Sequence, residues 1–245
     1  MAPREHRKVL MMTGPVAVVL AGGLARRMGG GDKPLRLLAG RALLGHVLDR
    51  VRPQVRAVAL SANGDPARFA PWGLPVLADP LPGNLGPLAG VLAGMRWAAA
   101  LGAADLLSVP ADTPFLPADL VTRLAAARRA AGVPIACAAS FGRTHPVVAL
   151  WPTDLADALA AALRGGARRI DHWTAGLGVA SAVFAAAGGD PFFNVNSPED
   201  LAEAEALLVS PATIPAECTA PGRPGRARTD PPATGTRSAR RKPSK

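Results

Sequence analysis

The segment Leu20–Pro34 (LAGGLARRMGGGDKP) combines the residue types that bind phosphate groups. It follows the apolar run Val16–Leu20, whose β-branched residues predict a short buried strand. Five glycines let the backbone turn sharply and bring N–H groups against a ligand. Arg26, Arg27 and Lys33 add positive charge to the same stretch. The segment therefore predicts a loop that holds a polyphosphate after the first strand.

Two well-known phosphate loops do not match this segment. A Walker A loop ends in Gly-Lys-Ser or Gly-Lys-Thr, whereas Lys33 stands between Asp32 and Pro34. The dinucleotide-binding fingerprint needs glycines spaced as G-x-G-x-x-G at the start of a helix, and Gly22 with Gly23 lacks that spacing. The segment is therefore a phosphate loop of another kind.

A carboxylate, Asp112, follows an apolar run within the sequence SVPADTPFLP. Prolines on both sides restrict the backbone and fix the direction of this side chain. A carboxylate at a strand end beside a triphosphate is typical of Mg²⁺ sites, because this ion prefers one or two carboxylates plus phosphate oxygens. The alternative is a turn or N-cap role at the helix expected near Pro117.

The order of strand and helix patterns predicts how these residues come together. The predicted strands are Val16–Leu20, Val55–Ser61, Leu74–Leu77, Asp105–Val109, Pro134–Ala139, Pro146–Leu150 and Val179–Phe184. The predicted helices are Ala42–Val51, Leu88–Leu101, Asp119–Ala131, Asp154–Leu163 and Ser197–Leu208, the last with Ser197 as its N-cap. This alternation predicts an α/β fold: a three-layer α/β/α domain with a mostly parallel, Rossmann-like sheet.

Asn63 and Asp79 follow the second and third predicted strands. On their own, both residue types are common in turns. In mostly parallel sheets, however, ligands bind beyond the carboxyl ends of the strands. The glycine-rich segment, Asn63, Asp79 and Asp112 are thus predicted to converge on one crevice.

The composition is that of one globular domain with extensions at both ends. The chain has 245 residues, of which 49% are hydrophobic, enough to bury a core. We expect a leader over residues 1–14, the domain over residues 15–209 and a disordered basic tail over residues 210–245, rich in Pro, Gly, Ser and Thr. Eight Lys and Arg residues lie in that tail, so the net charge of +10 describes the tail more than the domain.

Cysteine usage and hydropathy indicate a cytoplasmic protein. Cys137 and Cys218 lie far apart and predict neither a disulfide framework nor a metal cluster, which suits a reducing compartment. The basic start and the following apolar run imitate a secretory signal, but cleavage there would remove the glycine-rich segment. No uninterrupted run of about 18 apolar residues occurs, so no membrane span is expected.

The glycine-rich segment resembles the signature loop of the GT-A-like nucleotidyltransferases, which share the nucleotide-diphospho-sugar transferase fold. Within that group, LAGG at Leu20–Gly23, then RMGG and then Asp-Lys, resembles the molybdenum cofactor guanylyltransferases, the MobA family. Later segments follow in the order of that family: GPLAG, DTPFLP, HPVVAL and FFNVNSPED. The resemblance covers residues 16–208.

The resemblance implies an enzyme that transfers GMP from GTP to molybdopterin bearing molybdenum (Mo-molybdopterin), with the guanine dinucleotide cofactor and pyrophosphate as products. It implies Mg²⁺ as the cofactor. The implied residues are, for catalysis, Lys33, Arg27 and Asp112; for GTP, Leu20, Ala21, Gly22, Gly23, Lys33, Asn63, Asp79 and Asp112; for the acceptor, Arg168, Asn194 and Asn196; and for the metal, Asp112. Other cofactor-biosynthesis proteins and molybdoenzyme chaperones are further candidate partners, whereas a membrane and nucleic acid are not expected.

Three other functions stay open at this point. The related cytidylyltransferases more often have Ala-Ala-Gly in the loop and Ser before the arginine, where this chain has Ala21–Gly23 and Ala25, so the loop favours guanine. A sugar-phosphate nucleotidyltransferase is an alternative within the fold. A nucleotide- or RNA-binding regulator that uses the basic tail is the non-enzymatic alternative.

Two residue roles are also left open by the sequence. His145 could act as a general base, but no Asp or Ser partner for it is visible, which favours a structural hydrogen bond. Of Arg26 and Arg27, one is expected to face phosphate, and the sequence does not decide which.

Overall fold

The structure, a computed structural model, describes residues 14–22, 31–83, 85–185 and 189–209. These residues lie within the first of two compact units, Met1–Ile214, and the second unit, Pro215–Lys245, lies outside them. The predicted leader up to residue 13, residues 23–30 of the glycine-rich segment and the predicted basic tail are also outside the described residues. The predicted boundaries of leader, domain and tail therefore stay predictions.

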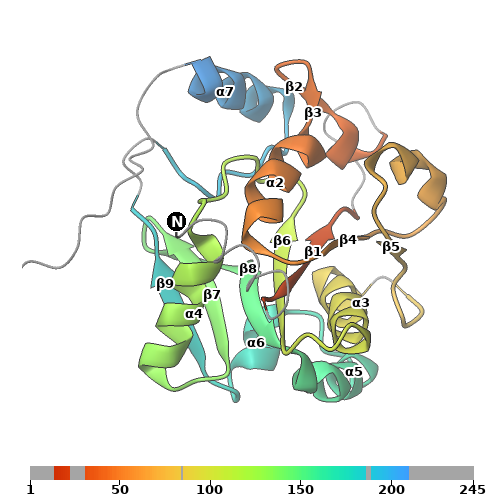
Figure 1. Ribbon diagram of the computed structural model, residues 1–245, viewed down its shortest axis with the longest axis vertical. Coiled ribbons are helices and arrows are strands. Elements are labelled where there is room, and N and C mark those ends of the chain that lie inside the picture. Colours follow the sequence, from red (N-terminus) through yellow and green to blue (C-terminus); the bar gives the residue numbers. More distant parts are fainter. Residues whose placement is uncertain (1–13, 23–30, 84, 186–188, 210–245) are drawn as a thin grey trace, which may run out of the picture. The chain divides into compact units, whose positions relative to one another are not determined.

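A seven-stranded sheet in the order β5-β4-β1-β6-β8-β7-β9 forms the centre of the described residues (Figure 1). Its strands are β1 (Val16–Leu20), β4 (Val58–Ser61), β5 (Val76–Leu77), β6 (Asp105–Pro110), β7 (Ile135–Ser140), β8 (Arg143–Pro152) and β9 (Val179–Val183). Neighbouring strands run parallel except at β8, which is antiparallel to both β6 and β7. The mostly parallel sheet that the sequence predicts is confirmed.

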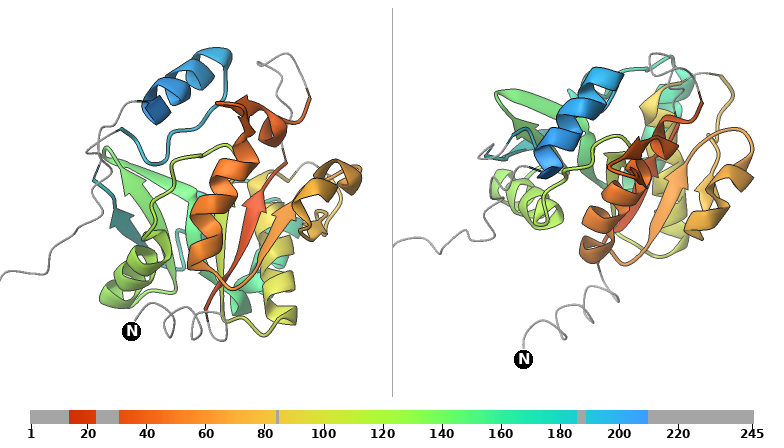
Figure 2. Two further views of the ribbon diagram at one scale, coloured as in Figure 1. Left: turned by 45° about the horizontal axis from the view of Figure 1, so that its top comes forward. Right: turned by 90° about the horizontal axis from the view of Figure 1, so that it is seen from above.

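Helices cover both faces of this sheet (Figure 2). They are α2 (Leu43–Val51), α3 (Pro87–Ala100), α4 (Leu120–Ala131), α5 (Ala156–Arg164) and α6 (Ile170–Thr174), followed by α7 (Pro198–Val209) nearer the carboxyl edge of the sheet. Residues of α2 and α4 belong to the core on one face, and residues of α3, α5 and α6 to the core on the other. The predicted three-layer α/β/α architecture is confirmed. Among the described residues, no helix has the length and apolar composition needed to cross a membrane.

The first strand shows why its sequence is continuously apolar. Ala17 and Val19 of β1 belong to one core, Val16 and Val18 belong to the other, and all four are fully buried. A strand that is buried on both faces cannot alternate apolar and polar residues. The run therefore marks a central strand of the sheet.

Helix α3 approaches β1 and β6 closely because it contains glycine. A Cβ atom at Gly94 would lie 2.7 Å from Val18 Cγ1 and 2.9 Å from Leu106 Cδ2. Contacts this short do not occur in a close-packed core without displacing a neighbour. The absence of a side chain at Gly94 thus sets how near the helix lies to the sheet.

Several short elements are not predicted by the sequence patterns. The hairpin of β2 (Leu37–Leu38) and β3 (Arg41–Ala42) turns at Ala39 and Gly40, both of which have positive φ. Such a turn usually has the sequence Asn-Gly or Asp-Gly. Because Ala39 stands at the first of these positions, the sequence does not indicate a hairpin here. The 3-10 helix η4 (Pro66–Trp72) and the one-turn helix α6 are also unpredicted, and β4 and β5 are shorter than predicted.

Helix α7 begins at a capped residue. Asp200 Oδ2 accepts hydrogen bonds from the N–H groups of Asn196 (2.7 Å) and Ser197 (3.0 Å), and the Asp200 N–H donates to Ser197 Oγ at 3.2 Å. The N-cap predicted at Ser197 is confirmed. This cap fixes the chain just before α7, where it passes the carboxyl edge of the sheet.

Candidate active site

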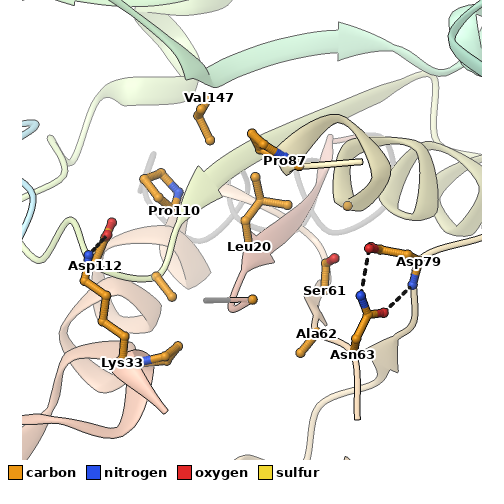
Figure 3. A pocket seen from close by; sticks show the side chains of 15 residues that line it. Leu20, Lys33, Ser61, Ala62, Asn63, Asp79, Pro87, Pro110, Asp112 and Val147 are labelled. Carbon is orange, nitrogen blue, oxygen red and sulfur yellow. Dashed lines mark hydrogen bonds and ion pairs between the residues drawn. The ribbon is translucent and has the colours of Figure 1, made fainter. Parts of the chain in front are cut away.

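The carboxyl ends of the parallel strands border a cavity of about 450 Å³ (Figure 3). Four strands end beside it: β1 before Gly22, β4 before Asn63, β5 before Asp79 and β6 before Asp112. The predicted site residues that line it are Leu20, Gly22, Lys33, Asn63, Asp79 and Asp112. The structure therefore brings together the groups that the strand order predicts to converge.

Lys33 and Asp112 form an ion pair at one end of this cavity. Lys33 opens the 3-10 helix η2 (Lys33–Leu35), where Pro34 suits a first-turn position because its missing N–H is not needed there. The Lys33 Nζ atom contacts Asp112 Oδ2 and also donates to Asn196 Oδ1 at 2.5 Å. The two charged side chains are only 14% and 18% exposed, so solvent screens them less than it screens a surface pair.

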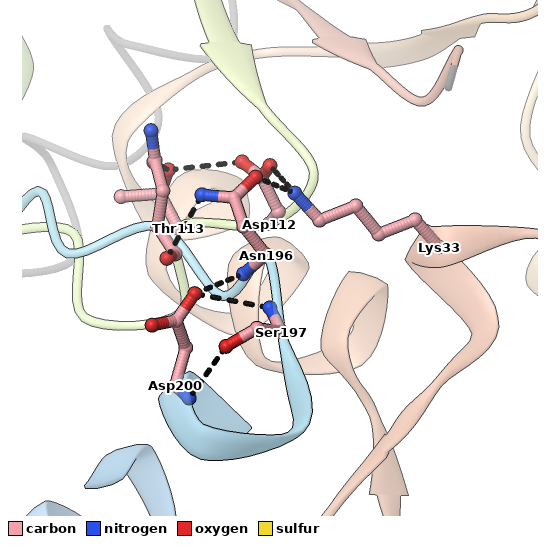
Figure 4. Close-up of polar contacts among 7 residues, drawn as sticks. Lys33, Asp112, Thr113, Asn196, Ser197 and Asp200 are labelled. Atoms are coloured by element: carbon pink, nitrogen blue, oxygen red, sulfur yellow. Dashed lines mark hydrogen bonds and ion pairs between the residues drawn. The ribbon is translucent and has the colours of Figure 1, made fainter. Parts of the chain in front are cut away.

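The segment 190–197, just before α7, closes against this ion pair (Figure 4). The Val195 N–H donates to the backbone carbonyl of Asp112 at 3.0 Å, and Thr113 Oγ1 donates to Asn194 Oδ1 at 2.7 Å. The Asn196 amide in turn donates to the Asn194 carbonyl at 3.2 Å. The structure thus places the predicted acceptor residues Asn194 and Asn196 directly beside Asp112. Thr113 was not among the predicted site residues.

Asn63 and Asp79 form a second polar pair, at the other end of the cavity (Figure 3). Asn63 Nδ2 donates to Asp79 Oδ2 at 2.7 Å, and the Asp79 N–H donates to Asn63 Oδ1 at 2.9 Å. Both functional groups of the Asn63 amide are therefore engaged, and among the described residues Asp79 Oδ1 has no hydrogen-bond partner. Asn63 orients Asp79, whose second oxygen can accept from a ligand.

An arginine that the sequence analysis did not single out links the two ends. Arg68 Nη2 donates to the Asn63 carbonyl at 2.6 Å, and Arg68 Nε lies 3.2 Å from Asp32 Oδ2. Asp32 directly precedes Lys33. The turn at Asn63 is therefore tied to the chain that carries the lysine.

The rest of the cavity wall is largely apolar and comes from residues that no site prediction named. They are Pro34, Ser61, Ala62, Gly86, Pro87, Gly90, Pro110, Ala111 and Val147. A Cβ atom at Gly90 would lie 2.6 Å from both Leu20 Cδ2 and Ser61 Oγ. The GPLAG motif was the sequence signal for this wall, because its small residues permit close approach.

Besides Asn194 and Asn196, which contact the ion pair and its neighbour Thr113 without lining the cavity, two predicted residues lie outside the lining. Ala21 is 1% exposed, and its N–H donates to the Ser61 carbonyl at 2.9 Å, so it extends the pairing of β1 with β4. Arg168 Nη1 donates to the carbonyls of Leu163 (3.1 Å) and Ala167 (2.8 Å), at the end of α5. A contact of Arg168 with an acceptor stays a prediction.

Three predicted residues of the glycine-rich segment, Gly23, Arg26 and Arg27, lie outside the described residues. The catalytic role predicted for Arg27 and the GTP contact predicted for Gly23 therefore stay predictions.

His145 lies near the beginning of β8 and outside the cavity lining. Its Nε2 atom is 2.8 Å from Ser140 Oγ. Burial lowers the pKa of His145, and Arg143 lowers it further, whereas the nearby Asp190 opposes both. The structural hydrogen bond favoured by the sequence analysis is present, and its serine partner comes from the neighbouring strand β7.

A metal ion at this site would need oxygen atoms from a bound molecule or from water, in addition to those of the protein. The described residues contain no group of three or more His, Cys, Asp or Glu that could hold a metal ion. Asp112 is the carboxylate beside Lys33, and within the described part of the chain its Oδ1 atom has only a 3.4 Å contact with Thr113 Oγ1. One carboxylate suits an ion that takes its other ligands from phosphate and water.

Solved structures share this architecture. Molybdopterin-guanine dinucleotide biosynthesis protein A from Archaeoglobus fulgidus has a TM-score of 0.60 at 23% identity, covering 79% of this chain and 98% of its own. CMP:2-keto-3-deoxy-manno-octonic acid synthetase in complex with CTP has a TM-score of 0.61 at 15% identity, with the same coverage. The fold is thus that of the α/β nucleotidyltransferases.

Sequence comparison narrows this class to a family. Residues 17–193 match the family described as "MobA-like NTP transferase domain". A molybdenum cofactor guanylyltransferase of Rhodopseudomonas palustris (strain BisB5) is 58% identical over 196 residues, which cover 79% of this chain and 93% of that protein. One from Acidiphilium cryptum is 55% identical over 191 residues, with 78% and 93% covered. The chain belongs to the MobA-like NTP transferase family.

Proposed function

We propose that this chain transfers the GMP group of GTP to Mo-molybdopterin, producing molybdopterin guanine dinucleotide and pyrophosphate. The observation that carries the proposal is the cavity itself, with Lys33, Asp112 and Asn196 meeting at one end and the Asn63–Asp79 pair at the other. Relatives named molybdenum cofactor guanylyltransferase, 58% and 55% identical to this chain, support the same reaction.

The Asn63–Asp79 end is the proposed base site. Guanine presents N–H donors on its N1–N2 edge, and a carboxylate is an acceptor only. Asn63 fixes the orientation of the Asp79 carboxylate by donating to its Oδ2 atom. The other oxygen, Oδ1, would accept a hydrogen bond from the base. An acceptor at this end is compatible with guanine, and the names of the relatives support the preference for GTP over CTP. Leu20 and Gly22, on the end of β1, would lie along the same nucleotide.

The Lys33–Asp112 end is the proposed phosphate site. An oxygen of the acceptor's terminal phosphate attacks the α-phosphorus of GTP in line, and the bond from that phosphorus to the oxygen bridging to the β-phosphorus breaks. Pyrophosphate leaves with the bonding electrons. The attacking phosphate is already ionised at neutral pH, so no general base is needed. The Lys33 ammonium stabilises the charge on the transferring and leaving groups, and Asn196 holds that ammonium in place.

Mg²⁺ is the proposed cofactor, with Asp112 as its protein ligand. The donor set fits, because this ion is usually bound by one or two carboxylates together with substrate phosphates and water. When bound, it would supply charge neutralisation to the triphosphate. The Asp112 oxygen that Lys33 does not contact, Oδ1, is the atom suited to it.

The remaining predicted roles complete the proposal. Asn194 and Asn196 border the phosphate end, which supports contacts with the acceptor phosphate. Arg27 and Arg168 would add positive charge for the same phosphates. The buried free thiol of Cys137 is compatible with action in the reducing cytoplasm.

The test is pyrophosphate release from the full chain in the presence of Mg²⁺ and Mo-molybdopterin, with GTP, CTP, ATP and UTP compared at matched concentration. We expect GTP to give the fastest turnover and expect no release without the pterin. Faster turnover with CTP would identify a cytidylyltransferase. Release that requires a sugar phosphate, or binding without release, would reject the proposed reaction.

A further inference from the structure

A buried polar cluster lies behind the segment 190–197 and outside the cavity. Ser140, at the end of β7, is fully buried. Its Oγ donates to Asp190 Oδ1 at 2.7 Å and lies 2.8 Å from His145 Nε2. A serine hydroxyl can donate one hydrogen bond, and Ser140 donates it to the Asp190 carboxylate. The contact with His145 must therefore be a hydrogen bond from a protonated Nε2 to the Ser140 oxygen. The Ser140 hydroxyl therefore both donates and accepts, and His145 Nε2 is not available as a base.

Asp190 uses the same contacts to fold the start of this segment. Its Oδ1 atom also accepts from the Phe192 N–H at 2.9 Å, and its carbonyl accepts from the Phe193 N–H at 3.0 Å. Its Oδ2 atom lies 3.6 Å from Arg143 Nη2, and the carboxylate is only 15% exposed. The turn after Asp190 is thus fastened to β7 by one buried hydroxyl.

Aromatic packing supports the same turn. Phe192 is 3% exposed, and its ring centroid lies 4.7 Å from that of His145 and 5.2 Å from that of Phe184, with the two phenylalanine rings edge to face. Such pairs add to the stabilisation gained from burial. The His145 ring therefore contacts the segment with its face and Ser140 with its Nε2 atom.

The far end of the segment is held independently by the cap at Ser197 and Asp200. Between these two fixed ends lie Asn194, Val195 and Asn196, which contact Thr113, the Asp112 carbonyl and Lys33. Their positions consequently depend on both anchors. The cap anchor was readable in the sequence, whereas the Ser140 anchor was not.

We propose that Ser140 and Asp190 are positioning residues: they hold the segment 190–197 so that Asn194 and Asn196 meet Thr113 and Lys33. They contact neither the cavity nor the proposed substrates, and they act through the two asparagines. The consequence for turnover rests on the proposed function, whereas the anchoring itself does not.

Hydrogen exchange tests the anchoring without any substrate. The variants are Ser140→Ala, which removes one hydroxyl, and Asp190→Ala, which removes the carboxylate. We expect the peptide spanning residues 190–197, with the Val195 N–H in it, to exchange about tenfold faster in both, because the loss of a buried hydrogen bond raises the equilibrium constant for local opening by about that factor. Asp190→Asn keeps an acceptor at Oδ1 and is expected to restore most of the protection.

Kinetics test the consequence for catalysis. We expect kcat to fall about tenfold in Ser140→Ala and Asp190→Ala while KM for GTP changes less than twofold, because the Asn63–Asp79 end is untouched. Arg128→Met is the matched control: it breaks the partly buried pair with Asp105, which stands at the opposite end of β6 from Asp112. This variant should lower the free energy of unfolding, but it should leave the exchange rate of residues 190–197 and kcat unchanged.

Three outcomes would overturn the proposal. Wild-type exchange of residues 190–197 in Ser140→Ala would show that the serine is no anchor. Faster exchange with an unchanged kcat would show that the anchor does not position the site. An equal loss of kcat in Arg128→Met would mean that the effect is general destabilisation. If no nucleotide supports turnover in the wild type, the proposed function fails, and the exchange result still decides the anchoring.

Discussion

Lys33 and Asp112 stand 79 positions apart in the chain and meet through a direct contact between the lysine ammonium and the Asp112 Oδ2 atom. The lysine comes from the chain after β1 and the aspartate from the end of β6, the strand that pairs with β1. Because neighbouring parallel strands end at the same edge, this pairing brings both residues to one place. In the proposed reaction, the Lys33 ammonium, which binds the phosphates, therefore lies next to the Asp112 carboxylate, which binds the metal.

Removal of the lysine ammonium should slow turnover without unfolding the protein. We expect Lys33→Ala to cost on the order of 10²–10³ in kcat, the scale for one preorganised group that stabilises developing charge. Lys33→Arg should restore only part of this loss, because a planar guanidinium does not replace a compact ammonium. Steady-state pyrophosphate release measures both. Arg41→Ala, at the exposed pair with Asp49, is the control and should keep wild-type kcat.

Removal of the Asp112 carboxylate should nearly abolish Mg²⁺-dependent turnover. The ion would lose its proposed protein ligand at the phosphate end, so it would be poorly placed between the phosphates. The measurement is the rate of pyrophosphate release of Asp112→Ala across a Mg²⁺ titration, alongside a thermal unfolding curve. Full activity in a correctly folded Asp112→Ala variant would refute the metal assignment.

The base end should behave as one coupled unit. Asp79→Ala should reduce kcat/KM for GTP by about 10–100-fold, the cost of leaving the base donors unpaired. Asn63→Ala should cause a similar loss, because Asn63 orients the Asp79 carboxylate. The double variant should then be little worse than either single variant. Strict additivity of the two losses would mean that the residues act separately.

The close packing of α3 predicts an unusual response to alanine. Ala is favoured over Gly within a helix by about 1 kcal/mol, yet Gly94→Ala should lower the free energy of unfolding by about 1–3 kcal/mol, because its Cβ would overlap Val18 and Leu106. Urea unfolding measures the difference. Gly176→Ala is the matched control, since nothing lies within 4 Å of a Cβ there, and it should be close to neutral.

Protonation of His145 should weaken the fold in mild acid. Burial is the main cause of its lowered pKa, so the unfolded chain, with a histidine pKa of about 6.5, binds more protons than the folded chain below that pH. The free energy of unfolding should therefore fall as the pH drops from about 6.5 through the lowered pKa. His145→Gln removes this titration and keeps a donor for Ser140. Its stability should depend less on pH between about 7 and 5, and an unchanged slope would contradict the assignment.

The sequence by itself determined the sheet and the edge where the site lies. Val16–Leu20 is apolar at every position and β-branched at three of them, which favours a strand buried on both faces, and the order of strands and helices predicted the layers. Asn63, Asp79 and Asp112 follow strands in the chain, and parallel strands share their carboxyl edge. These inferences need only the hydropathy pattern of short segments and the direction of the chain.

Only the tertiary structure decided which side chains meet. Local patterns do not reveal that β8 lies antiparallel between β6 and β7, because strand pairing joins residues far apart in sequence. The hydrogen-bond partner of His145 follows from that pairing, because Ser140 comes from β7. Asp190 then accepts from Ser140, although it lies 50 positions later in the chain. The same holds for Lys33 and Asn196, which are separated by 163 positions. A hydrogen bond forms only when the donor–acceptor distance is correct to within a few tenths of an ångström, and the packing of the whole domain sets that distance.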